Sequence, residues 1–151
     1  MYQKTMVPLD GSELAEYVLP HIAAITEGGG VREVIFIRVV KPFNLTPVRG
    51  EPVISDEELE QLDAKSEAAA DGYLDRLVIR VSYDKTKISQ TTILGEAAGS
   101  LVDYATNNKV DLIAIATHGR SGLSRWIWVS TADRILRHTR VPIMMVRVPK
   151  A

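Results

Sequence analysis

The sequence predicts an α/β fold, in which a single domain forms an open parallel sheet of five strands with helices on both faces. Short apolar runs alternate with longer segments of helical periodicity, which is the pattern of successive β-α-β units. Most of these runs are continuously apolar and therefore indicate strands buried on both faces. The chain has 151 residues, the length of one domain, and contains no low-complexity tract that could act as a linker.

Five segments are predicted to be strands. One of them, residues 87–94, is more polar than the others and alternates weakly, so it is placed at an edge of the sheet. The other four are rich in Val, Ile, Leu and Met. The four apolar strands cover residues 4–9, 33–40, 111–117 and 142–148, and the polar one covers residues 87–94.

Four helices are predicted between these strands. Ser12 can cap the first helix, Pro20 is expected to kink it, and a run of three glycines ends it. The second helix opens with Ser55 and Glu58, whose spacing is that of a capping box. The third and fourth helices are predicted over about residues 96–107 and 130–138.

The composition narrows the classes of partner. The formal net charge is −1, so no strong field attracts nucleic acid or an anionic membrane surface, and neither is expected as a partner. There is no cysteine, which excludes disulfides and thiolate chemistry. The three histidines are too scattered to form a metal-binding motif, and no run approaches the roughly 20 apolar residues of a membrane span. A cytoplasmic location is expected.

A ligand site is predicted where two strands end. Open parallel sheets bind ligands beyond the carboxyl ends of the strands, at the point where the winding reverses. If the first and fourth strands flank that point, residues 8–12 and 116–122 form the site. Asp10 would offer its carboxylate to a ribose or to a cation that bridges phosphates. The alternative is that Asp10 only caps the first helix or forms an Asx turn.

Several residues after the fourth strand suit a phosphate. Gly119 and Gly122 permit close approach of the backbone, and Arg120 offers a forked donor. Ser130 and Thr131 would stand at a helix start, where free backbone N–H groups and the helix dipole favour an anion. An ordinary N-cap is the alternative explanation of these two hydroxyl residues, and it is the preferred one.

The aromatic residues nearby have two interpretations. His118 could contact a ligand, or it could simply be exposed in the turn. Trp126 and Trp128 could stack on a base, but burial in the fold or in a partner chain is the preferred reading. No nucleophile and base occur at a recognisable spacing, so no catalytic residue is predicted.

Four stretches resemble the universal stress protein family, and together they extend over nearly the whole chain: "VPLDGS", "ILGEAAGSLVDYA", "DLIAIATHGRSGLSRW" and "VPIMMVR". This resemblance implies an adenine nucleotide alpha hydrolase-like sheet of order 3-2-1-4-5, a homodimer and, in the members that bind ATP, a motif. The motif is a glycine, two residues, a second glycine, nine residues, a third glycine, and then Ser or Thr.

Only part of this motif is present. Its positions fall on Ala116, Gly119, Val129 and Ser130, so two of the three glycines are replaced. A β-branched residue is disfavoured at positive φ, and strain of about 1–3 kcal/mol at Val129 would weaken nucleotide binding by about five- to 150-fold.

The resemblance also implies roles for individual residues. Asp10 would face the nucleotide, and the main chain of Val39 would read the adenine. Gly119, Arg120, Ser130 and Thr131 would surround the phosphates. The complete expected site consists of Pro8, Leu9, Asp10, Val39, Ala116, His118, Gly119, Arg120, Gly122, Val129, Ser130 and Thr131.

Three functions follow as hypotheses. The first is binding of ATP with Mg²⁺, weakened by Val129. The second is an interaction module of the same fold that works as a dimer without nucleotide, with residues 142–148 pairing antiparallel with their copy at an apolar sheet edge. The third is an enzyme, at most a slow ATPase that would use Asp10 and a bound cation.

Overall fold

The structure is a computed structural model that describes residues 2–28, 30–43, 49–50, 53–118 and 125–149, and the side chains of these residues except those of 118 and 125–130. Within this part of the chain, no helix is long and apolar enough to cross a membrane.

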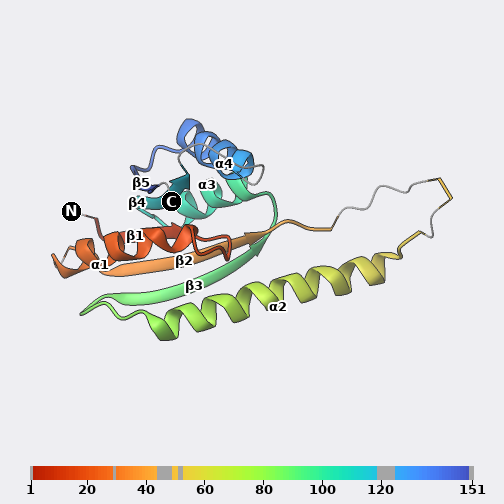
Figure 1. Cartoon of the computed structure of the whole chain (residues 1–151), viewed down its shortest axis with the longest axis horizontal. Helices are drawn as coiled ribbons and strands as arrows, with labels where there is room; N and C mark the ends of the chain where they lie inside the picture. Colours follow the sequence, from red (N-terminus) through yellow and green to blue (C-terminus); the bar gives the residue numbers. More distant parts are fainter. Residues whose placement is uncertain (1, 29, 44–48, 51–52, 119–124, 150–151) are drawn as a thin grey trace.

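The five predicted strands form one sheet, and every neighbouring pair is parallel (Figure 1). The strand order is β3-β2-β1-β4-β5, which confirms the predicted order and the edge position of the polar strand. The short central β1 lies between β2 and β4, so the winding reverses there. The strands are β1 (Lys4–Pro8), β2 (Glu33–Val40), β3 (Lys87–Leu94), β4 (Leu112–His118) and β5 (Ile143–Val148).

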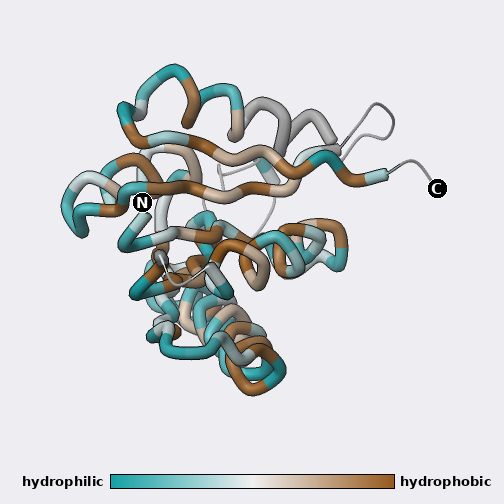
Figure 2. Tube along the Cα trace, turned by 90° about the vertical axis from the view of Figure 1, so that its left-hand side faces the viewer, coloured by the Kyte–Doolittle hydropathy of each residue, from teal (hydrophilic) through white to brown (hydrophobic). Residues whose placement is uncertain are grey.

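Helices cover both faces of the sheet, as predicted. A 3-10 turn, η1 (Ala15–Val18), with α1 (Leu19–Glu27) and α2 (Asp56–Arg80) packs on one face, and α3 (Ala97–Asn107) with α4 (Arg125–His138) packs on the other. β1 and β2 each contain four consecutive buried residues. Along the rest of the chain, apolar and polar residues alternate over short distances (Figure 2). Each face therefore has its own buried core. Phe36 and Leu74 belong to the core under α2, and Ile37 and Leu101 to the core under α3.

The first helix differs from its prediction. It is not one kinked helix, because η1 comes first and α1 starts at Leu19. Pro20 lies in the first turn of α1, where a missing N–H costs nothing, so the proline marks a helix start rather than a kink. The prediction that Ser12 caps the first helix is also wrong, because the N-cap residues are Leu14 for η1 and Val18 for α1, and neither makes a side-chain cap hydrogen bond. The Ser12 Oγ does accept a hydrogen bond of 3.2 Å from the amide of Ala15, the first residue of η1.

The second helix begins as predicted. The Ser55 Oγ accepts from the Glu58 amide at 3.2 Å, and the Glu58 carboxylate accepts from the Ser55 amide at 2.9 Å. This reciprocal capping box satisfies two N–H groups that would otherwise lack partners at the helix start. From there α2 runs for 25 residues, past the end of the sheet (Figure 1).

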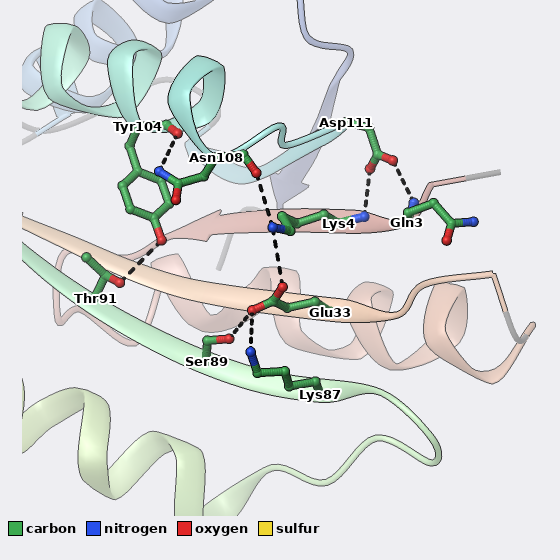
Figure 3. A network of polar contacts seen from close by, with 9 residues as sticks. All are labelled: Gln3, Lys4, Glu33, Lys87, Ser89, Thr91, Tyr104, Asn108 and Asp111. Atoms are coloured by element: carbon green, nitrogen blue, oxygen red, sulfur yellow. Dashed lines mark hydrogen bonds and ion pairs between the residues drawn. The ribbon is translucent and has the colours of Figure 1, made fainter.

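A polar network ties together the amino ends of the central strands (Figure 3). Glu33 on β2 lies 3.5 Å from Lys4 of β1 and 3.4 Å from Lys87 of β3, and it accepts a hydrogen bond from Ser89. The carboxylate of Asp111 accepts from the amides of Gln3 and Lys4, at 2.7 and 2.9 Å, and so fixes the start of β1 beside β4. These contacts give the acidic and basic residues at the amino ends of the strands a structural role.

Replacing Glu33 by glutamine should lower the free energy of unfolding by about 1 kcal/mol at pH 7, because two ion pairs lose their charge. The hydrogen bond from Ser89, assisted by both lysines, holds the pKa of Glu33 below its ordinary value. Its stabilising effect is therefore present above the pKa of the unfolded chain and disappears as the pH falls through the folded pKa. Urea unfolding of both proteins at pH 7 and pH 3 should show a difference in the free energy of unfolding that is smaller at pH 3. An equal gap at both values would contradict this assignment.

Candidate functional site

The carboxyl ends of β1 and β4 meet where the winding of the sheet reverses. α1 follows β1 on one face and α4 follows β4 on the other, and sheets of this topology bind ligands in the crevice expected between two such strand exits. The pairing sets Thr5 beside Leu112, and continuing this register sets Leu9 level with Ala116. The structure therefore sets the end of β1 beside β4, which leads into the second segment that the sequence selected; residues 119–122 of that segment lie outside the described residues.

Pro8 and Leu9 form the floor of this crevice rather than its contact surface. Pro8 is the last residue of β1, and Leu9 is buried, with its amide bonded at 2.9 Å to the carbonyl of Ile37. Ala116 is partly buried against the core under α1 and α2. These residues fix the position of the strand exits.

Asp10 forms the Asx turn that the sequence left open as an alternative. Its Oδ1 accepts hydrogen bonds from the Ser12 amide at 2.8 Å and from the Ser12 hydroxyl at 2.5 Å. Gly11, between them, has a φ of +85°, a conformation that favours glycine. Among the described residues no hydrogen bond engages the Asp10 Oδ2. One carboxylate oxygen thus shapes the turn while the other can meet a ligand.

The end of β2 extends past the end of β1. The last residue of β1 pairs with Ile37, whereas Arg38, Val39 and Val40 pair only with β3. The side chain of Val39 packs toward the core under α3. On the side where β1 has ended, Val39 therefore offers its main-chain groups rather than its side chain. This is the arrangement expected if the main chain of Val39 reads a base.

The β4 side of the crevice is described in part. Gly119, Arg120 and Gly122 lie outside the described residues. His118 is the last residue of β4, and Val129 and Ser130 lie within α4. For these three residues, as for Trp126 and Trp128, the structure describes the backbone but not the side chain. Their contacts to a ligand stay predictions.

The predicted start of the fourth helix is wrong. α4 begins at Arg125, so Ser130 is its sixth residue and Thr131 its seventh. Backbone N–H groups that deep in a helix bond within it, and they are not the free donors of a helix start. The reason is that residues 125–130 contain no glycine or proline to stop a helix, and a hydroxyl residue is tolerated inside one. Thr131 is buried, at 8% exposure.

A second polar cluster, missed by the sequence reasoning, lies under the Asp10 turn. The guanidinium carbon of Arg38 lies 5.4 Å from the centre of the Tyr73 ring. The Tyr73 hydroxyl donates to Glu16 at 2.9 Å, and Arg80 donates to the same oxygen at 2.8 Å. Burial and the bond to Glu16 raise the pKa of Tyr73 well above its usual range. The available signal was an arginine in an otherwise apolar strand.

Other features lie away from the crevice. A cavity of about 760 Å³ opens at the amino ends of β4 and β5, opposite to the strand exits, and Tyr2, Lys109, His138 and Arg140 contribute to its lining. No group of three or more acidic or histidine side chains within the described residues could hold a metal ion.

The sequence matches the model of the universal stress protein family over residues 1–147. The universal stress protein MJ0531 of Methanocaldococcus jannaschii is 26% identical over 99% of this chain and 85% of its own length. The solved structure of protein MJ0577 of the same organism has a TM-score of 0.76 at 21% identity, covering 100% of this chain and 99% of the other.

Two further solved structures of similar fold carry adenine nucleotides. A universal stress protein in complex with cAMP has a TM-score of 0.60 at 16% identity, with 98% of each chain covered. A universal stress protein family protein of Arabidopsis thaliana with AMP bound has a TM-score of 0.64 at 13% identity, covering 97% of this chain and 92% of the other. With the family model matched almost from end to end and the fold shared in full, this chain belongs to the universal stress protein family.

Proposed function

We propose that this protein binds an adenine nucleotide, ATP with Mg²⁺, in the crevice between β1 and β4. The observation that carries the proposal is the meeting of the Asp10 turn with the overhanging end of β2 at the reversal of the sheet. Family members of the same fold hold AMP and cAMP, which supports an adenine ligand.

Each part of the nucleotide has a partner in this proposal. The adenine lies against the main chain of Val39, and the ribose or a phosphate-bound cation meets the Asp10 carboxylate. The phosphates extend toward Gly119, Arg120 and the start of α4. Magnesium is included because a single arginine cannot neutralise a triphosphate, and carboxylate and phosphate oxygens are the ligands that this ion prefers.

Replacing Asp10 by alanine should lower the affinity for ATP by about tenfold, since the variant loses both the free oxygen and the Asx turn. Asp10→Asn is the matched control, because its side-chain oxygen can still accept from Ser12 while the charge is gone. Calorimetric titration with ATP, with and without Mg²⁺, measures both. We expect Asp10→Asn to approach wild type without Mg²⁺ and, with it, to lose only part of the affinity that Asp10→Ala loses, because its turn is intact. No binding of ATP by the wild type would refute the proposal.

A dimeric interaction module that needs no nucleotide is the second candidate. Ala116 and Val129 replace motif glycines. β5 is an edge strand, and Met145 on it is 45% exposed. An apolar edge strand is a ready template for pairing with a second copy. Under this candidate, the surface made by a β5-paired homodimer carries the function.

A further inference from the structure

Arg38 is a cation near the carboxyl end of β2, a strand that is otherwise apolar after its first residue, Glu33. The two residues before it, Phe36 and Ile37, are fully buried, and Arg38 is half-buried on the face that α2 covers. No hydrogen bond or ion pair to a described residue neutralises its guanidinium, which stacks instead against the Tyr73 ring. A half-buried charge without a hydrogen-bond or ion-pair partner costs free energy, so the position of Arg38 calls for a reason.

The group beside it is the turn that follows β1. A Cβ built on Gly11 would lie 3.0, 3.1 and 3.2 Å from Nη1, Cζ and Nη2 of Arg38. Because three atoms of the planar guanidinium are almost equally distant, the plane faces Gly11 nearly flat. Gly11 can accept this contact because it has no side chain, and its φ of +85° sets the Asp10–Ser12 turn.

The stack is anchored to two other elements. Tyr73 lies on α2, and its hydroxyl is held by Glu16 of η1, which Arg80 of α2 also holds. Movement of Tyr73 is therefore restrained from two sides. A continuous set of contacts runs from α2 through Tyr73 and Arg38 to the Gly11 backbone.

We propose that Arg38 is a positioning residue that holds the Asp10–Ser12 turn in its ligand-binding shape and makes nucleotide affinity depend on α2. This inference rests on the proposed function, because the turn matters only if Asp10 meets the ligand. Arg38 acts through the turn and does not touch the phosphates. Without Mg²⁺ the turn meets only the ribose, so the effect of Arg38 should then be the same for a ligand with phosphates and for one without them.

The test compares ATP with adenosine, both in the absence of Mg²⁺, so that no cation on the phosphates can contribute through Asp10. Arg38→Met keeps much of the side-chain length but removes the charge and the plane, and we expect its affinity for both ligands to fall about tenfold by calorimetric titration. Arg38→Lys keeps the charge without the plane and should lose about threefold for both. Arg76→Met is the matched control, because Arg76 is an exposed arginine on α2, one turn from Tyr73, and its loss should change neither affinity.

A measurement without ligand separates this inference from the proposed function. Hydrogen exchange at the Ser12 amide, which reports the Asx bond, should be about tenfold faster in Arg38→Met and unchanged in Arg76→Met. Unchanged Ser12 exchange in Arg38→Met overturns the positioning role, and so does a loss confined to ATP, which would make Arg38 a phosphate ligand. If the wild type binds neither ligand, the proposed function fails, whereas faster exchange still supports the hold of Arg38 on the turn. If Arg38→Met does not fold, the same two measurements, ligand affinity and Ser12 exchange, are made on Arg38→Lys.

Discussion

Replacing Val129 by glycine should raise the affinity for ATP by about five- to 150-fold. In the structure residue 129 is the fifth residue of α4, where a helical backbone suits valine. The family motif has glycine at this position, a residue free to adopt positive φ. If the nucleotide-bound form needs positive φ at residue 129, it forces Val129 into a backbone region that β-branched residues avoid. The strain is about 1–3 kcal/mol, which corresponds to the stated change in affinity.

The control for this prediction is Val129→Ala. Alanine removes the branched side chain but is also disfavoured at positive φ, so its gain should be well below that of glycine. Glycine also weakens the first turns of α4, which helps the amides near residue 130 become available to phosphate. Calorimetric titration of the three proteins with ATP and Mg²⁺ decides the matter. Equal affinities for wild type and Val129→Gly would show that residue 129 is not the obstacle.

Replacing Met145 by proline should convert a homodimer into a monomer. The amide of Ile113 bonds to the carbonyl of Pro142 at 2.9 Å, so the even-numbered residues of β5 face β4 with their main chain. The N–H and C=O of Met145 therefore point to the open edge. Proline at this position removes an outward donor and spares the ladder to β4. It should abolish antiparallel pairing of residues 142–148 with their copy.

Met145→Val is the matched control, because it keeps the N–H and a strand-favouring apolar side chain. Light scattering at micromolar concentration should give the mass of two chains for wild type and for Met145→Val, and of one chain for Met145→Pro. A dimer that survives the proline would place the interface elsewhere on the molecule. A monomeric wild type would contradict the predicted dimer. It would also contradict the hypothesis of a dimeric interaction module.

The sequence by itself determined the strands and their layering. Residues 34–37, for example, are apolar on both faces of their strand, and only a sheet covered on both sides can bury them. The strand order followed from the family resemblance. Local chemistry also fixed the capping box at Ser55, because the two residues that form it are three positions apart in the chain. Asp10 was selected because it follows a buried strand and precedes a glycine, and the Asx turn that it forms is equally local.

Only the tertiary structure decided what depends on contacts between distant segments. Ser130 resembles a helix start in the sequence, yet the helix begins at Arg125. Ser124, which precedes Arg125 in the sequence, is a residue type equally favoured at a helix start, and the sequence alone does not choose between the two serines. The sequence shows Arg38 as one charge in an apolar run, but its partners Gly11 and Tyr73 are 27 and 35 positions away. Packing of α2 against the sheet brings these three together. The physical reason is that patterns in the sequence report which surfaces must be buried, whereas the group that covers each surface is chosen when the layers pack.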